Sequence, residues 1–215
     1  MRHHLAICEE KTPDGCLSFT ERKMKTSLSI VLPLSLFTAI NLFAQGKPLT
    51  ATQVVDEAVA QAARQNKNVF IIFHASWCGW CRKMDSSMAD PGCKTFFDEH
   101  FVIRHLVVDE TPDKKALENP GANALRSRYG GDNEGIPFWF ILDRDGHLVA
   151  DSQLRPAGAA PGSKGQNVGC PAQAEEVSYF LSVLKKVADL TPTQQNAIEE
   201  RFRKNDDHPA GVAGN

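Results

Sequence analysis

The chain has 215 residues, of which 42% are hydrophobic and 23% are charged, and these proportions are ordinary for a protein with a buried core. Its formal net charge of −2 gives no electrostatic reason to expect binding to nucleic acid or to an acidic membrane surface. The length allows one domain with additional segments.

The first part of the chain differs from the rest. Residues 1–23 are charged and patternless, and we interpret them as a non-native upstream extension. From Met24, a short basic start is followed by an apolar run to Phe43 and by the small residue Ala44. This order predicts a signal peptide over 24–44 and an exported, periplasmic or secreted protein. An uncleaved anchor is the alternative, although the run is short for a membrane span.

The next part alternates predicted helices and strands. Apolar residues at helical spacing predict an amphipathic helix over 50–65. Residues 69–73 form a continuous apolar run, which predicts a buried central strand. A helix is expected over 78–88 and another over 93–100, with a break at the Asp-Pro-Gly sequence between them. A second strand is expected over 102–108, so the pattern indicates an α/β protein.

A broken helix is expected over 112–129, with an Asn-Pro-Gly sequence in its middle. Two further strands are predicted at 138–142 and 147–151, joined by Asp-Arg-Asp-Gly, which is a strong hairpin signal. A hairpin that follows alternating strands and helices predicts a central mixed sheet with helices on both faces.

The remaining chain opens with a stretch over 152–171 that is rich in Gly, Pro, Ala and Ser, which we interpret as a mobile loop. Apolar spacing over 177–188 predicts a helix that closes the core. Thr191-Pro192 is typical of the start of a helix, which gives an extra C-terminal helix. We expect a disordered tail over 205–215. The folded domain is therefore predicted to span 45–204.

One motif, Trp77-Cys78-Gly79-Trp80-Cys81, lies between the buried strand and the next helix. Two cysteines three residues apart on a first helical turn share a face and are close enough to bridge. Cys78 lies at the helix start, where the dipole favours a thiolate nucleophile. Cys81, expected to be more buried, is placed to resolve a mixed disulfide. The alternatives are a structural disulfide or half of a zinc site. Zinc normally needs a second pair at matching spacing, which is not found among the scattered Cys93, Cys170 and His105.

This motif, together with a later Gly135-Ile136-Pro137, resembles the active site of the thioredoxin superfamily, and the resemblance covers roughly Thr50 to Asp189. The sequence around the motif is similar to that of exported thioredoxin-like proteins related to the C-terminal domain of thiol:disulfide interchange proteins. The resemblance implies a thioredoxin-like fold. It also implies a cis Ile136–Pro137 bond that faces the dithiol and presents backbone groups to an extended substrate peptide.

The resemblance implies a redox-active Cys78–Cys81 disulfide as the catalytic group. Ile136 and Pro137 are implied as substrate-binding residues, and Trp77, Gly79 and Trp80, which flank Cys78, are expected to join them. Relatives often carry Pro or His at the Trp80 position, and Trp80 is expected to offer an apolar surface to protein substrates. The alternative is that both tryptophans only cover the edge of the core. Thioredoxins carry a buried Asp six residues before the first cysteine, but that position is Ile72 here. Proton transfer from the resolving thiol is therefore expected to use water or another group, and the direction of electron flow stays open.

The expected function is that of an exported thiol:disulfide oxidoreductase that acts on protein thiols and disulfides as a monomer. No metal or organic cofactor is implied, and a membrane electron donor stays open as a partner. One alternative is a non-catalytic binding module with a redox-sensitive or copper-holding dithiol. Another is a disulfide isomerase or chaperone. A second disulfide between Cys93 and Cys170 is left open, although the topology of the fold that the resemblance implies argues mildly against it.

Overall fold

The computed structural model describes residues 46–159 and 163–206. The predicted upstream extension, the predicted signal peptide and residues 207–215 of the predicted tail lie outside the described residues. Within the described ranges, no helix is both long enough and apolar enough to cross a membrane.

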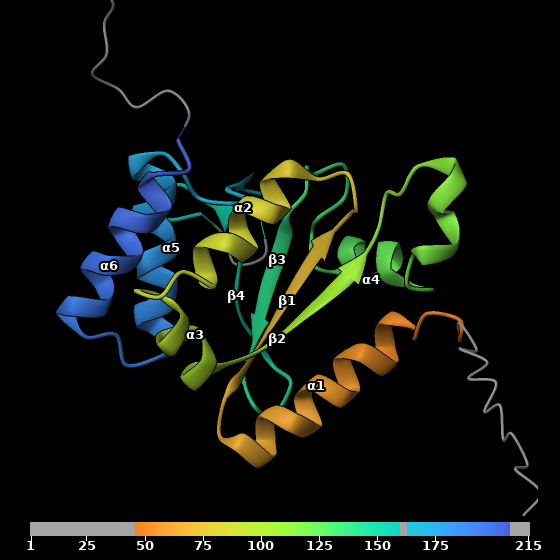
Figure 1. The fold of residues 1–215 in the computed structure, drawn as a ribbon, viewed down its shortest axis with the longest axis horizontal. Helices are drawn as coiled ribbons and strands as arrows, with labels where there is room; N and C mark the ends of the chain where they lie inside the picture. The colour runs from red at the N-terminus through yellow and green to blue at the C-terminus, as the bar shows by residue number, and fades with distance from the viewer. Residues whose placement is uncertain (1–45, 160–162, 207–215) are drawn as a thin grey trace, which may run out of the picture. The chain divides into compact units, whose positions relative to one another are not determined.

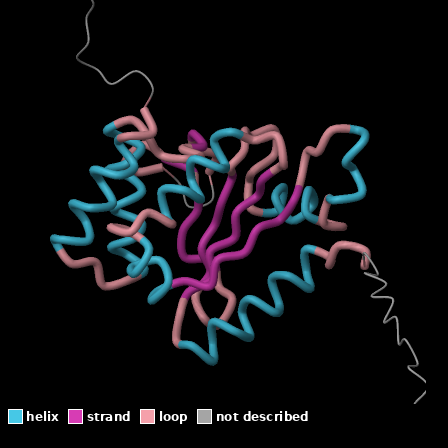
Figure 2. The backbone as a smooth tube through the Cα atoms, in the orientation of Figure 1, coloured by secondary structure: helices cyan, strands magenta, loops and turns pink. Residues whose placement is uncertain are grey.

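A four-stranded mixed sheet in the order β2-β1-β3-β4 forms the centre of the fold (Figures 1 and 2). β1 (Asn68–His74) pairs in parallel with β2 (Phe101–Val107) and antiparallel with β3 (Phe138–Leu142). β4 (Leu148–Asp151) is antiparallel to β3 at the sheet edge. The two inner strands are buried because their unbroken apolar runs face helices on both sides.

The helices divide between the two faces of the sheet (Figure 1). One core contains side chains from α1 (Ala51–Gln65) and α4 (Ala122–Arg128). The core on the other face contains side chains from four helices, namely α2 (Gly79–Met88), α3 (Lys94–His100), α5 (Ala174–Val187) and α6 (Pro192–Arg203). The predicted α/β thioredoxin-like fold with an extra C-terminal helix is confirmed.

The broken helix predicted over 112–129 consists of two different helices. Its first part is a 3-10 helix, η1 (Pro112–Leu117), and α4 forms the second part. Gly121, in the break, has a φ of 83°, a left-handed conformation that favours glycine. The Asn-Pro-Gly sequence therefore separates the two helices, as its composition indicates.

The prediction of a mobile loop over 152–171 is wrong for the described part of that segment. β5 (Gln153–Leu154) pairs antiparallel with β6 (Gln166–Asn167). Several of the neighbouring side chains are buried, namely Ser152, Gln153, Val168 and Cys170. The order comes from polar contacts with distant parts of the chain, which composition does not reveal.

The predicted tail also begins too early, because Asn205 is only 3% exposed. Its side-chain Nδ2 donates to Ser87 Oγ at 2.9 Å and lies 3.4 Å from Cys170 Sγ. Its carbonyl oxygen accepts a hydrogen bond from Lys83 Nζ at 3.2 Å. The fold therefore includes at least one residue beyond the predicted end at 204.

Candidate active site

Cys78 and Cys81 are joined by a disulfide at the beginning of α2, with their Cα atoms 5.3 Å apart. Cys78 is the N-cap residue of the helix, and its Sγ accepts a hydrogen bond from the Cys81 backbone N–H at 3.1 Å. In the reduced protein, this N–H and the helix dipole would favour the thiolate of Cys78. The arrangement is suited to making Cys78 the attacking sulfur.

The two cysteines are equally buried, each only 2% exposed, whereas the sequence predicted that Cys81 would be the more buried of the two. Ala75 and the two cysteines form one small buried cluster, and Ile136 packs against it. The carbonyl oxygen of Ile136 lies 3.5 Å from Cys78 Sγ. This close approach explains why the first cysteine is as covered as the second.

The Ile136–Pro137 peptide bond is cis, as the resemblance implied. Both residues line a groove of about 620 Å³, and Trp80 of α2 lines the same groove. The segment 166–170 contributes further lining. The groove therefore joins three regions that are far apart in the sequence, next to the disulfide.

The two tryptophans of the motif are exposed, Trp77 by 53% and Trp80 by 44%. Trp77 Nε1 donates to the carbonyl oxygen of Asp109 at 2.8 Å. Lys83 Nζ lies 4.3 Å from the centroid of the Trp80 ring, in a cation–π contact. Gly79, between them in sequence, is exposed as well. The motif residues on either side of Cys78 are thus exposed, whereas both cysteines are buried.

A buried carboxylate supports the turn before the dithiol, and sequence reasoning missed it. Glu110 is only 4% exposed, and it accepts hydrogen bonds from Ser76 N–H at 2.6 Å and Ser76 Oγ–H at 2.8 Å. These hydrogen bonds lower the pKa of Glu110, because they stabilise the charged form. Arg82 Nη1 donates to the Ser76 carbonyl oxygen at 3.0 Å, so both the N–H and the carbonyl of Ser76 are held.

Ile72 is buried, so the position at which thioredoxins carry an acid is apolar here. On the same side of β1, the half-buried ring of His74 lies 4.8 Å from the ring of His105. His105 Nε2 lies 2.8 Å from Oδ1 of Asp85. Asp85 lies on α2, one helical turn after Cys81. Burial lowers the pKa of His74, and the nearby His105 lowers it further.

Cys93 and Cys170 are free thiols, so no second disulfide joins them. Cys93 Sγ lies 3.8 Å from the carbonyl oxygen of Ala197, whereas Cys170 Sγ is a neighbour of the Asn205 amide. Burial raises the pKa of Cys93 to about 11 and that of Cys170 to about 12. Both groups therefore stay protonated at neutral pH and are poor nucleophiles.

Among the described residues, one group of three side chains has the spacing of metal ligands, namely Asp143, Asp145 and His147 in the turn after β3. Asp143 Oδ1 already accepts backbone hydrogen bonds from Asp145 and His147, each at 2.9 Å. These contacts are those of an ordinary acidic turn. The dithiol does not belong to this group.

Residues 50–144 match the model of a protein family described as thioredoxin-like. The matched stretch contains Cys78, Cys81, the cis proline and the three strands β1, β2 and β3. Residues 50–144 are therefore similar to the thioredoxin-like family. The match and the Cys78–Cys81 pair together support a thiol–disulfide redox role.

Solved structures give weaker likenesses. A disulphide isomerase from Xylella fastidiosa Temecula1 is 26% identical over 53% of this chain and 80% of that one, with a TM-score of 0.39. The oxidised C-terminal domain of DsbD from Neisseria meningitidis is 22% identical over 48% and 84% of the two chains, with a TM-score of 0.31. A thioredoxin from Thermus thermophilus is 20% identical over 60% and 81%, with a TM-score of 0.36. All three TM-scores are below 0.5, so these likenesses support no conclusion about function. No curated protein matches the chain.

Proposed function

We propose that this protein is an exported thiol–disulfide oxidoreductase that reduces or exchanges the disulfides of other proteins through Cys78 and Cys81. The observation that carries the proposal is the disulfide at the start of α2, with the cis-proline turn 3.5 Å from Cys78 Sγ. A purely structural disulfide would not need a groove beside it that is lined by the exposed Trp80. Cys93 and Cys170, by contrast, are buried thiols.

The reaction follows from the positions of the two sulfurs. In the reduced protein, the Cys78 thiolate attacks one sulfur of a substrate disulfide, which forms a mixed disulfide and releases the other substrate sulfur as a thiolate. The Cys81 thiolate then attacks Cys78 Sγ, which forms the intramolecular disulfide and releases the second substrate thiolate. Two electrons pass from the protein to the substrate, and the two released thiolates take up protons. The reverse sequence oxidises a substrate dithiol.

Cys81 must lose its proton before it attacks. Because Ile72 provides no carboxylate, we propose that this proton leaves through water or through the group formed by His74, His105 and Asp85. Asp85 lies one turn along α2 from Cys81, which places the group on the same part of the helix.

Export is proposed from the sequence of residues 24–44, which lie outside the described residues. The test is amino-terminal sequencing of the protein recovered from the periplasm or medium. We expect a mature start at Gln45. A start before Leu28 would contradict cleavage at this site.

The redox proposal is tested by insulin reduction with dithiothreitol as the electron source. We expect Cys78→Ser to abolish turnover and Cys81→Ser to accumulate a covalent mixed disulfide with the substrate. Cys93→Ser is the matched control and should retain activity, because that thiol lies outside the exchange reaction. Full activity of Cys78→Ser would overturn the assignment. Refolding of a scrambled disulfide protein and metal analysis of the reduced chain test the isomerase and copper-holding alternatives.

A further inference from the structure

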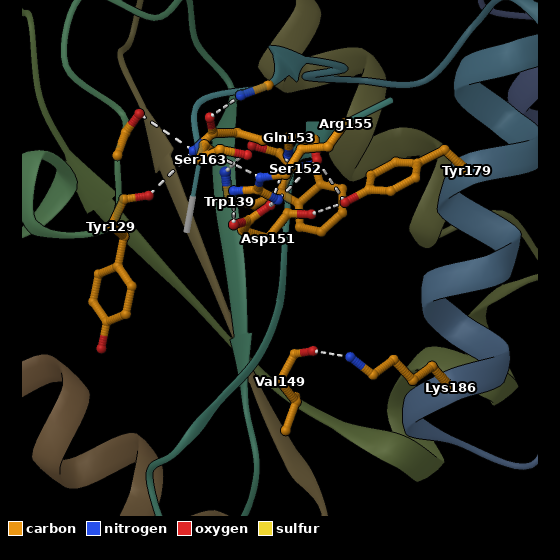
Figure 3. A network of polar contacts seen from close by, with 12 residues as sticks. Tyr129, Trp139, Val149, Asp151, Ser152, Gln153, Arg155, Ser163, Tyr179 and Lys186 are labelled. Carbon is orange, nitrogen blue, oxygen red and sulfur yellow. Dashed lines mark hydrogen bonds and ion pairs between the residues drawn. The ribbon is translucent and has the colours of Figure 1, made fainter. Parts of the chain in front are cut away.

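The chain makes an ordered excursion between β4 and α5, which we call the β5–β6 segment and define as residues 152–155 and 163–169. Figure 3 shows how its base is held. The guanidinium of Arg155 donates to both carboxylate oxygens of Asp151, at 2.9 and 2.7 Å. Arg155 Nε also donates to the Ser163 carbonyl oxygen at 2.5 Å. One arginine therefore joins the two arms of the segment to the end of β4.

A second set of contacts ties the segment to the rest of the fold (Figure 3). The buried side chain of Gln153 donates through Nε2 to the carbonyl oxygens of Tyr129 and Gly130, both at 3.3 Å. Its Oε1 accepts the Gly165 N–H at 2.9 Å. The hydroxyl of Tyr179, on α5, lies within 3.0 Å of the Asp151 and Gln153 carbonyl oxygens. The segment is thus fixed to two neighbouring elements.

From this base the segment reaches the cis-proline turn through Asn167. The Nδ2 group of Asn167 donates to the carbonyl oxygen of Gly135 at 2.8 Å and to that of Pro137 at 3.2 Å. Its Oδ1 accepts the Gly169 N–H at 3.1 Å, and the Gly169 carbonyl oxygen accepts a hydrogen bond from Trp139 Nε1 at 2.8 Å. A single amide therefore holds the carbonyl groups on both sides of Ile136.

The hydrogen bonds of Asn167 determine where Ile136 lies. With the residues before and after it held, the Ile136 carbonyl stays 3.5 Å from Cys78 Sγ, at the edge of the groove. Asn167 itself lines that groove, as do Trp80 and Ile136. An extended polypeptide that binds there would meet a backbone already fixed in position, which reduces the entropy lost on binding.

We infer that Asn167 is a positioning residue for polypeptide substrates, because it fixes the Ile136–Pro137 turn from which the groove presents its backbone to an extended chain. The inference rests on the proposed function. A small disulfide needs only access to Cys78 and makes no strand-like pairing with the turn. Asn167 therefore affects the use of polypeptide substrates and leaves exchange with small disulfides unchanged.

The test compares steady-state insulin reduction with the rate at which the reduced full-length protein reduces 5,5′-dithiobis(2-nitrobenzoate). Asn167→Ala removes both donated hydrogen bonds and should raise KM for insulin by about three- to tenfold, with kcat and the small-disulfide rate unchanged. Asn167→Asp should raise KM further, because a carboxylate repels the carbonyl oxygens of Gly135 and Pro137. Asn123→Ala is the matched control, since Asn123 is exposed on α4 and should leave all parameters at their wild-type values.

The two proposals fail in different ways. An insulin KM that stays at the wild-type value in both Asn167 variants of an active enzyme would overturn the role of Asn167. An equal loss with insulin and with the small disulfide would also overturn it, because that result indicates general damage to the dithiol. A wild-type protein inactive towards both substrates would overturn the proposed function instead. Should Asn167→Ala fail to fold, Asn167→Asp carries the test, because it keeps an acceptor for the Gly169 N–H.

Discussion

The carboxylate of Glu110 accepts hydrogen bonds from both the backbone N–H and the hydroxyl of Ser76, two residues before Cys78. The loop after β2 is thereby fixed to the turn that leads into α2. In the same loop, the Asp109 carbonyl oxygen accepts a hydrogen bond from the Trp77 indole N–H, and the Asp109 carboxylate accepts one from Arg126 Nη1 at 2.6 Å. The position of the dithiol therefore depends on polar contacts outside the cysteine motif.

Replacement of Glu110 by glutamine should lower stability at pH 7, because an amide carries no charge and accepts more weakly than a carboxylate. The hydrogen bonds from Ser76 lower the pKa of Glu110 below its ordinary value of 4.5. The contribution of the ionised Glu110 to the stability of the fold is therefore fully present above pH 4.5 and is lost as the pH falls through the lowered pKa. Urea unfolding at pH 7 and pH 3 should show a gap between wild type and Glu110→Gln that narrows at pH 3.

Glu99→Gln, at an exposed position of α3, serves as the control for Glu110 and should show no such pH-dependent gap. A gap between wild type and Glu110→Gln that is equal at both pH values would show that the charge of Glu110 is not what stabilises the turn.

The thiols of Cys93 and Cys170 should resist alkylation. Burial raises their pKa to about 11 and about 12, so almost no thiolate is present at pH 8. We expect iodoacetamide to label neither residue in the native protein, whereas both react in urea. Peptide mass spectrometry separates these sites from the other cysteines. Rapid labelling of Cys170 in the native state would show that the groove beside it opens.

Removal of the Arg155 side chain should destabilise the β5–β6 segment. Arg155→Ala leaves the nearly buried Asp151 carboxylate without its guanidinium partner, at a cost of about 1–3 kcal/mol. Hydrogen exchange should accelerate at Gly165, whose N–H is held by this segment. The double variant Arg155→Ala/Asp151→Asn should recover part of the loss, because no unpaired charge remains.

Arg128→Ala is the control for Arg155, as Arg128 is an exposed arginine of α4. Asp151→Asn alone gives the stability loss caused by the second substitution. If the double variant lost that full amount in addition to the loss from Arg155→Ala, the two side chains would not be acting as a pair.

His74 should make the protein less stable in mild acid. Burial and the neighbouring His105 lower the pKa of His74 below 6.5, while Asp85 and Glu110 oppose this shift. Because the unfolded chain binds the proton more readily, stability is full above pH 6.5 and falls as the pH drops towards the lowered value. Unfolding free energies from pH 8 to pH 5 should decline less steeply for His74→Gln than for wild type. Equal slopes would contradict this account.

The sequence predicts the centre of this fold well because that centre is built from local signals. Residues 69–73 of β1 and all of β3 are unbroken apolar runs, which are typical of buried strands. The Cys78–Cys81 pair is equally local, since the spacing alone places both sulfurs on one helical turn. The cis bond at Ile136–Pro137 was accessible only through the family resemblance, because most X–Pro bonds are trans.

The polar framework around the dithiol was not predictable in the same way. Asn167 reaches Gly135, 32 residues earlier, and Glu110 reaches Ser76, 34 residues earlier. Such contacts leave no periodic pattern, and a Gly- and Pro-rich composition is shared by mobile loops and by ordered segments that are held from outside. The described part of the 152–171 stretch is ordered because of partners that only the folded chain brings close.

Asn205 lies two residues beyond the end of α6, yet its side-chain amide donates a hydrogen bond to Ser87 of α2. Anyone who trims this protein for crystallisation, or joins it to a fluorescent reporter, should therefore keep the chain through Asp206. A stop codon after Arg203 would keep α6 whole but would remove the hydrogen bond that joins Asn205 to α2, the helix that begins at the Cys78–Cys81 disulfide.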